Sequence, residues 1–340
     1  MKFVPNNNTN KFKIEDVFLV KTKGISFTNS ITNTSKTSKN KPTESYKIYK
    51  NPFEVHKYGS EQLKLTQDTR YHLNNFTDSN LGLLLCTDKN TSNNCIHFWI
   101  FSQFVFQNNI STKNSKEIFF PLFLYPPKSD QLELSSTQTS SFKKGANHPF
   151  LDKKANLNTH FIKSISEIIH KKYHQDLSNN EYVSALELFD YIVFNLFYTN
   201  LASNEIILPT DKENFEICVK KGTHIRELMN WEHKKVFSYI STFPEQGNNL
   251  VDKYVYVNSQ AIPNRLYINY SEIDENDPNP LQYFENVPQN IWDFKIGKIE
   301  PLKIWLDHHV HQKLMFSQIM HFQKMIAIIK EITDLKNHIC

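Results

Sequence analysis

The sequence is poor in glycine and cysteine, and each shortage excludes a kind of site. The 7 glycines form no G-x-G turn and no GxxxxGK[ST] loop, so the chain encodes neither a dinucleotide-binding turn nor the phosphate loop of a nucleotide-driven motor. The 4 cysteines contain no CxxC pair, which argues against a zinc ribbon. They are Cys86, Cys95, Cys218 and Cys340, and we expect free thiols in a reducing cytoplasm.

A long apolar run is also absent, as is the D/N-P-P-Y/F segment with which a DNA methyltransferase holds its target base. The most apolar stretch, Phe98–Phe106, is about half of the ~18–20 residues that a membrane-spanning helix needs. The Pro126–Pro127 pair stands in a different sequence context. We therefore expect a soluble, cytoplasmic protein that has no membrane partner, is not itself an enzyme, and holds no cofactor and no metal.

The net charge of +4 is small, but the charges are distributed unevenly. Residues 1–50 hold ten lysines against three acidic residues, and residues 143–172 hold seven lysines against two. Residues 272–285 are acidic instead. This separation allows one basic face for a polyanion, and ordinary solvated surface is the alternative explanation.

Hydropathy patterns predict an α+β fold with a β-rich first half. Residues 1–10 are expected to be a disordered tail, residues 11–125 the β-rich part, and the polar residues 126–150 a linker or long loop. Within the β-rich part we predict a half-buried strand over 12–20, a strand over 46–49, a hairpin of 81–86 and 95–101, and a strand over 119–125.

The second half, residues 151–340, is predicted to be a mixed and more helical part of the same module. Apolar residues three and four apart predict helices over 159–173, 181–198 and 317–337, the first of them capped by Asn158 or Thr159. Alternating residues predict strands over 251–257 and 266–270.

Asp307 and His311 are the candidate metal ligands, because a helix would place them one turn apart on one face. The alternative, which we favour, is a polar helix junction after Trp305 and Leu306, since histidine is more often not a metal ligand.

The segment Asn286–Asn337 combines tryptophan, glycine and proline in an uncommon order. It contains Pro288, the run W-D-F-K-I-G-K-I-E-P-L-K-I-W-L over residues 292–306, and a helix with His321, Phe322 and Thr333. This resembles the end of the C-terminal specificity domain of type ISP restriction–modification enzymes. That family has a Pro, then W-x-[FY]-x-I-G-G-Y-x-P-L-x-x-W-L, and then a helix with a His-Tyr pair and a late Thr.

Earlier segments resemble other blocks of the family in the same order, so the resemblance covers about residues 12–335. Among them, Tyr49–Phe53 is similar to Y-R-P-F-D, Lys154–Asn158 to K-x-N-L-N, and Gly222–Leu228 to a G-x-x-L-R-x-L helix. The positions that carry the framework of the resemblance are Gly24, Pro52, Phe53, Pro121, Asn156, Trp292, Gly297, Pro301 and Trp305.

Several arginines of the family pattern are missing. Lys50–Asn51 stands where the family has the arginine of Y-R-P-F-D, and His308–His309 stands where it has K-x-R. Arginine is the usual bidentate reader of guanine and a strong phosphate contact. Residues typical of a core are therefore retained better than polar ones.

The resemblance implies a DNA-binding specificity module with double-stranded DNA as partner. A separate methyltransferase or restriction–modification chain would supply S-adenosylmethionine chemistry and base flipping. The basic side chains expected to contact DNA are Lys21, Lys23, Lys50, Lys143, Lys144, Lys153, Lys154, His308 and His309. The second hypothesis is a degenerate structural relic that docks on a methyltransferase without reading sequence, and the third is an unrecognised enzyme.

Overall fold

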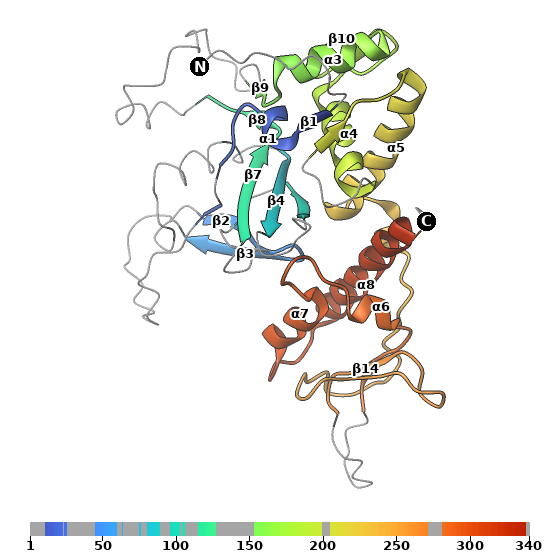
Figure 1. Ribbon diagram of the computed structural model, residues 1–340. Coiled ribbons are helices and arrows are strands. Elements are labelled where there is room, and N and C mark those ends of the chain that lie inside the picture. Colours follow the sequence, from blue (N-terminus) through green and yellow to red (C-terminus); the bar gives the residue numbers. More distant parts are fainter. Residues whose placement is uncertain are drawn as a thin grey trace. The chain divides into compact units, whose positions relative to one another are not determined.

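The computed structural model (Figure 1) has most of its strands in the first half of the chain and its longest helices in the second, which confirms the predicted α+β fold. The chain divides into two compact units. Unit 1 comprises Met1–Asn51 and Val55–Arg226, and unit 2 comprises Pro52–Glu54 and Glu227–Cys340. The structure describes residues 11–22, 24–25, 45–59, 63, 75, 80–88, 96–102, 104–105, 115–126, 153–198, 205–270 and 281–337.

The expected tail over 1–10 and the expected linker over 126–150, apart from Pro126, lie outside the described residues. The division between the two units falls elsewhere, near the end of helix α5 (Lys212–Met229). The chain also passes into unit 2 and back at the turn Pro52–Glu54.

The central sheet of unit 1 contains the predicted hairpin. Strand β4 (Gly82–Asp88) pairs antiparallel with β5 (Ile96–Phe101) on one side and with β7 (Ser115–Pro121) on the other. Leu84 and the next residue, Leu85, are both buried, although consecutive side chains of a strand point to opposite faces. The sheet is therefore covered on both faces, which explains why β4 is an uninterrupted apolar run.

A second sheet of unit 1 has the strand order β3–β2–β6. Strand β2 (Ser45–Asn51) confirms the strand predicted over 46–49, and it runs parallel to β6 (Phe104–Val105). Strand β3 (Glu54–Gly59) follows β2 after the two-residue turn Pro52–Phe53, so β2 and β3 form a hairpin, called the β2–β3 hairpin below.

The predicted strand over 12–20 is wrong. Strand β1 (Lys11–Lys13) pairs with β12 (Glu205–Ile207), and the chain then turns into the short helix α1 (Ile14–Val17). Both end residues of α1, three positions apart, are fully buried. Three-residue spacing places both on one face of a helical turn, so the burial pattern favours a turn over an extended strand here.

Helix α3 (Thr159–Ile169) begins as predicted, because the Asn158 side chain accepts a hydrogen bond from a backbone N–H of the first turn. It ends at Ile169, four residues earlier than predicted, because the next residue, His170, has a left-handed backbone with a φ of 55°. The chain then enters strand β10 (Lys172–Tyr173), which pairs in parallel with β11 (Tyr182–Val183).

Helix α4 (Ala185–Tyr198) begins later than the predicted residue 181, because Ser184 caps its first turn in a capping box with Glu187. The Glu187 N–H donates to the Ser184 hydroxyl (3.1 Å), and the Ser184 N–H donates to the Glu187 carboxylate (2.8 Å). This reciprocal pair satisfies two backbone donors that helix geometry leaves open.

Helices α4 and α5 share a buried ion pair. Arg226 donates to the two carboxylate oxygens of Asp190 at 2.6 and 3.2 Å, and the Thr223 hydroxyl donates to the same carboxylate at 2.7 Å. Both charged groups are buried, so each depends on the other to compensate for its lost hydration.

Unit 2 combines a small antiparallel sheet with four helices among its described residues. The sheet has the order β13 (Val255–Val257), β14 (Arg265–Tyr267), β15 (Tyr283–Phe284), which confirms the two strands predicted here at shorter length. The helices are η3 (Lys234–Phe237, a 3-10 helix), α6 (Gln289–Trp292), α7 (Pro301–His309) and α8 (Phe316–Asn337). Helix α8 agrees closely with the prediction.

Cys86 and Cys218 are free thiols, as expected, and both are buried. No helix in the described part of the chain combines the length and the apolar composition needed to cross a bilayer.

Candidate nucleic-acid interface

Asn156, one of the framework positions, fixes the segment that carries three of the expected basic residues. Its side chain is fully buried, accepts from the Val20 N–H (2.7 Å), and donates to the carbonyl oxygens of Val20 (2.7 Å) and Pro121 (2.8 Å). The amide group therefore joins the segment that follows α1 to the end of β7. Lys21, Lys153 and Lys154 lie on the chain segments that it joins.

Two of these three lysines have their charge matched by an acidic neighbour. Lys21 donates to Glu15 at 2.6 Å and lowers the pKa of that carboxyl below its ordinary value. Lys153 lies 2.9 Å from Asp176 and likewise lowers its pKa. Lys154 is exposed and makes no ion pair with any described residue. These lysines form a mixed surface of both signs and not a continuous basic one.

The β2–β3 hairpin has a different charge pattern. Lys47, Lys50 and Lys57 are exposed on it, together with His56. Residues 45–59 contain a single acidic residue, Glu54, and its side chain is buried. The exposed surface of the hairpin therefore carries cations and no carboxylate.

Sequence reasoning named Lys50 but missed Lys47 and Lys57. The signal was present on β2, where Lys47 and Lys50 flank the buried pair Ile48–Tyr49. Because Ile48 and Tyr49 are consecutive residues of a strand, their burial means that both faces of β2 are covered there, and recognising the exposed lysines on either side required the structure.

His308 and His309, the other expected contacts, use their rings inside unit 2. The Nδ1 atom of His308 lies 2.8 and 2.9 Å from the two carboxylate oxygens of Glu54. His309 stacks on Trp305 with ring centroids 3.8 Å apart, and its Nδ1 lies 2.7 Å from the Trp305 carbonyl oxygen. The remaining expected residues, Lys23, Lys143 and Lys144, lie outside the described residues.

The framework tryptophans are part of the core of unit 2. His321 stacks on Trp231 at 4.7 Å and faces Trp305 at 6.2 Å. Its Nε2 lies 3.1 Å from the carbonyl oxygen of Phe53, which can only accept, so this nitrogen carries the proton. Burial lowers the pKa of His321 below 6.5, so the ring is neutral at pH 7.

Trp292, the other framework tryptophan, packs against the small sheet and α7 of unit 2. Its ring stacks on Tyr256 at 5.7 Å and 10°, and the Lys303 amine lies 5.3 Å from the ring centroid. Gly297 has a φ of 59° in a two-residue turn that Ile296 and Ile299 close with mutual hydrogen bonds, a position that favours glycine.

The remaining framework residues also support the fold. Pro301 occupies the first turn of α7, where its missing N–H costs nothing, and Gly24, Pro52 and Pro121 are buried. Eight of the nine framework positions are thus buried, and the ninth, Gly297, forms a turn.

The expected helical pair of Asp307 and His311 does not form. Helix α7 ends at His309, and His311 has a φ of 63° outside it. Asp307 accepts from the Tyr254 hydroxyl at 2.6 Å, and His311 lies 3.6 Å from Asp252. Within the described ranges no three His, Cys, Asp or Glu side chains converge as metal ligands would. Asp307 and His311 thus lie at and beyond the end of α7, each beside a partner of its own.

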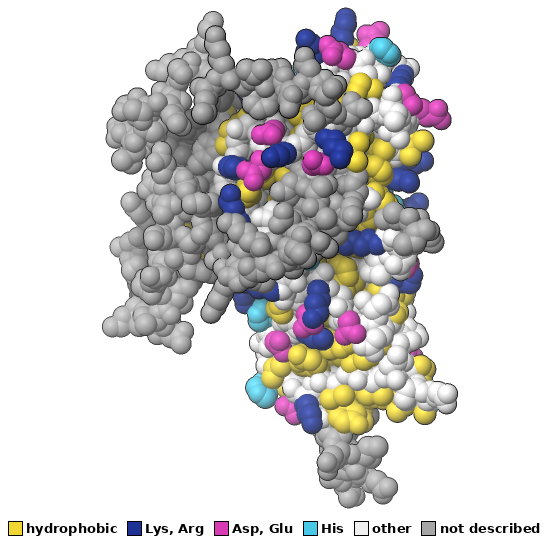
Figure 2. Space-filling model, viewed as in Figure 1, with side chains coloured by type: hydrophobic (Ala, Val, Ile, Leu, Met, Phe, Trp, Pro, Cys, Tyr) yellow, Lys and Arg dark blue, Asp and Glu magenta, His cyan; other side chains and the backbone are white. Residues whose placement is uncertain are grey.

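On the face shown in Figure 2, the described lysines and arginines are interspersed with acidic side chains. On that face, the described residues therefore form no continuous basic surface.

Three solved structures share this fold at low sequence identity. The ATP-dependent Type ISP restriction-modification enzyme LlaBIII bound to DNA aligns with a TM-score of 0.54, 13% identity, and coverage of 90% of this chain and 19% of that chain. A nuclease-deletion mutant of the Type ISP restriction-modification enzyme LlaGI in complex with a DNA substrate mimic aligns with a TM-score of 0.52 and 10% identity. The alignment covers 87% of this chain and 21% of that chain. The DrdV–DNA complex aligns with a TM-score of 0.56 and 11% identity, and the alignment covers 87% of this chain and 28% of that chain.

This chain therefore shares the fold of one part of these proteins, and it spans 19–28% of their length. The Type ISP C-terminal specificity domain matches residues 4–337, and the chain belongs to that family. No curated protein matches the chain in sequence.

Proposed function

We propose that this chain is the DNA-binding specificity module of a Type ISP-like restriction–modification methyltransferase system and acts with a separate catalytic chain. Its family membership and the DNA-bound state of the structures that share its fold support this proposal. The observation that carries it is the β2–β3 hairpin, on which Lys47, Lys50 and Lys57 are exposed while its one carboxylate, that of Glu54, is buried.

Lysines on such a hairpin suit a phosphate backbone. A two-stranded ribbon fits the major groove of B-DNA, and contacts to phosphates fix the position of a protein on the duplex without reading its sequence. Lysine binds phosphate as a point charge and does not need the fork geometry of arginine. The hairpin would therefore supply affinity and register, while other side chains would read the bases.

Arginine is not the reader among the described residues. Arg226 is buried against Asp190, and Arg265 pairs with Glu285 at 3.0 Å and lies over the Tyr283 ring at 4.3 Å. Arg70, the third arginine of the sequence, lies outside the described residues. Base recognition by the described residues would therefore depend on Asn, Gln or Lys side chains, which pair with adenine and guanine edges.

The chemistry belongs to the partner in this proposal. The chain lacks the glycine turn and the target-base segment of a methyltransferase, so the S-adenosylmethionine site and base flipping are assigned to the other chain. The specificity module would place that chain over its target base.

The test has two parts, both on the full chain. Selection from a pool of random duplexes should enrich one sequence, and the enriched duplex should be bound more tightly than its scrambled version. Lys47→Glu combined with Lys57→Glu should weaken binding to both duplexes alike, by about tenfold or more. The matched control, Lys172→Glu with Lys220→Glu, reverses two exposed lysines of unit 1 outside the hairpin and should keep the affinity.

The engagement of both described arginines inside the fold also favours a second candidate, a structural relic that docks on a methyltransferase without reading sequence. That candidate predicts no enrichment in the selection but co-purification with a methyltransferase from the native cell. The relic is excluded if one sequence is enriched, if the control double variant still binds that duplex, and if the hairpin double variant does not.

A further inference from the structure

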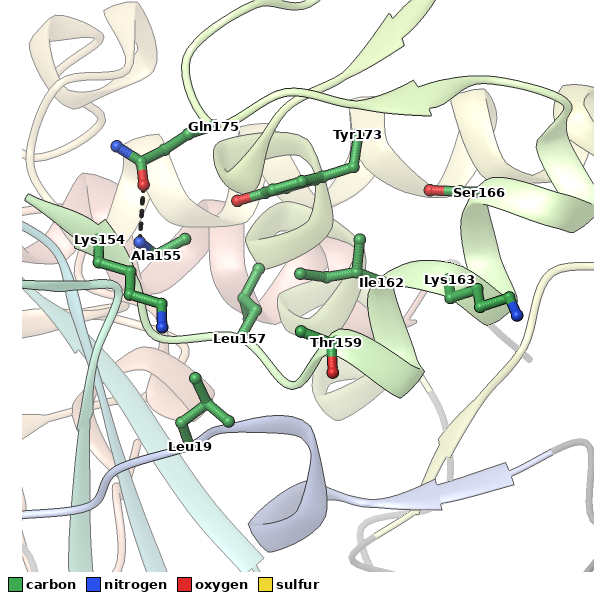
Figure 3. Close-up of a pocket in the computed structure, with 10 residues that line it drawn as sticks. All are labelled: Leu19, Lys154, Ala155, Leu157, Thr159, Ile162, Lys163, Ser166, Tyr173 and Gln175. Carbon is green, nitrogen blue, oxygen red and sulfur yellow. Dashed lines mark hydrogen bonds between the residues drawn. The ribbon is translucent and has the colours of Figure 1, made fainter. Parts of the chain in front are cut away.

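A pocket of about 400 Å³ opens on unit 1 outside the β2–β3 hairpin (Figure 3). Its walls come from the segment after α1, from residues 154–157, from one face of α3 and from residues 173–175. This volume is within the range of about 300–1,000 Å³ in which proteins hold small ligands. The β2–β3 hairpin contributes no residue to this pocket, although Lys154, one of the basic residues expected to contact DNA, lines it.

The middle of the pocket is apolar. Leu19, Leu157 and Ile162 project into it from three separate segments, and the ring of Tyr173 lies across the opposite side (Figure 3). An aromatic ring that enters this space would lie against a flat aromatic wall and aliphatic side chains, a packing that is favourable beyond the area buried.

Polar groups stand at the two ends of this apolar space. At one end the Lys154 amine is exposed and makes no ion pair with a described residue. At the other end the Ser166 hydroxyl points toward Tyr173, is buried, and has no hydrogen-bond partner in the described part of the chain. A buried hydroxyl without a partner costs free energy, and a ligand that bonds to it would recover that cost.

The remaining polar side chains of the pocket fit this arrangement. Burial, followed by the charge of Asp176, raises the pKa of Tyr173 to about 12, so its hydroxyl stays protonated and can donate to an anion. Lys163 points away from the apolar middle and lies 3.7 Å from Glu167, which leaves Lys154 as the cation of the pocket.

We propose that this pocket binds a nucleotide, with the base between Tyr173 and the Leu157–Ile162 floor and the phosphate at Lys154. A base supplies a flat ring with heteroatoms for the Ser166 hydroxyl, and a phosphate supplies the anion for the lysine. A fatty acid would satisfy the lysine but leave the hydroxyl without a partner. A free mononucleotide and an unpaired nucleotide of a DNA strand offer the same chemistry.

The test is a calorimetric titration of the full chain with deoxyadenosine monophosphate. Deoxyadenosine, inorganic phosphate and octanoate serve as partial ligands, and each should bind more weakly than the mononucleotide. Lys154→Ala should weaken binding of the mononucleotide by about tenfold, as expected for the loss of one charge-assisted hydrogen bond. Lys172→Ala, the control on β10, should leave it unchanged.

Ile162→Trp, which fills the pocket, should abolish binding, and circular dichroism should show that each variant is folded. Tighter binding of single-stranded oligodeoxyadenylate than of the mononucleotide assigns the ligand to DNA, and the reverse order assigns it to a free nucleotide. The proposal is overturned if the folded wild type does not bind at millimolar mononucleotide, if octanoate binds more tightly, or if Lys154→Ala binds like wild type. Lys47→Glu with Lys57→Glu should still bind the mononucleotide, which separates this result from that of the duplex experiment.

Discussion

Gly222 of α5 lies directly against the backbone of Asp190 in α4: a Cβ added at Gly222 would be 1.9 Å from the Asp190 carbonyl oxygen. The obstacle is backbone and not the end of a flexible side chain, so it cannot move aside without shifting a helix. The same residue of α4 holds Arg226 through its carboxylate. The two helices are therefore fixed both by contact distance and by charge.

Gly222→Ala should lower the free energy of unfolding by about 2–3 kcal/mol, because the added methyl forces α4 and α5 apart. Alanine is the better helix former, so propensity alone predicts the opposite sign. Urea denaturation followed by circular dichroism measures the difference. Lys220→Ala, an exposed substitution on the same helix, is the control and should change stability by less than about 0.5 kcal/mol. A variant as stable as wild type would contradict the close packing of α5 against α4 at Gly222.

Arg226→Met should cost about 3–5 kcal/mol, because it leaves the buried Asp190 carboxylate without the guanidinium that compensates its charge. Combining it with Asp190→Leu removes both charges and should restore much of the loss. Chemical denaturation of the two single variants and the double variant gives the coupling energy. Additive effects, with no recovery in the double variant, would contradict the buried ion pair.

The neutral His321 predicts a loss of stability at acid pH. Burial holds its folded pKa below 6.5, so the unfolded chain binds more protons than the folded chain as the pH falls through 6.5. The free energy of unfolding should therefore decrease on going from pH 7.5 to pH 5.5. His321→Gln removes this titration and should show a smaller decrease, measured by urea denaturation at the two pH values. An equal decrease in both proteins would exclude His321 as the source.

DNA binding through the β2–β3 hairpin predicts a specific salt dependence. Lys47→Ala with Lys57→Ala should reduce the slope of log affinity against log salt by about 2, since each lysine that neutralises a phosphate releases about one counterion from the DNA. Fluorescence anisotropy of a labelled duplex at several salt concentrations measures the slope. An unchanged slope with reduced affinity would mean that these lysines act through the fold and not on phosphates.

The spacing of apolar residues was sufficient to predict the long helices and the buried hairpin, because burial of apolar side chains dominates the sequence pattern in those elements. It placed α8 almost to the residue, and it recognised β4 and β5 from their apolar runs. It failed over 12–20, where two apolar residues three apart suit a helical turn, and it extended α3 past His170, whose left-handed backbone leaves no trace in hydropathy.

The candidate site was less predictable, because charge in sequence does not show which charges meet in space. Lys21 and Lys153 looked free but face Glu15 and Asp176. His308 looked like a surface cation but lies against Glu54, 254 positions earlier. The resemblance to the family named framework positions that are mostly buried, because core residues are set by packing. It could not show which cations remain exposed after the chain has folded.

The turn Pro52–Glu54 is grouped with the carboxyl-terminal unit although it lies early in the chain. During synthesis it leaves the ribosome long before His321, which bonds to Phe53 across 268 positions. The carboxyl-terminal core is therefore completed late, around a piece of chain made early, and such distant contacts slow folding. A fragment made from Glu227 onward would lack the Phe53 ring that packs 5.8 Å from Trp231, so an isolated carboxyl-terminal piece would be missing part of its own interior.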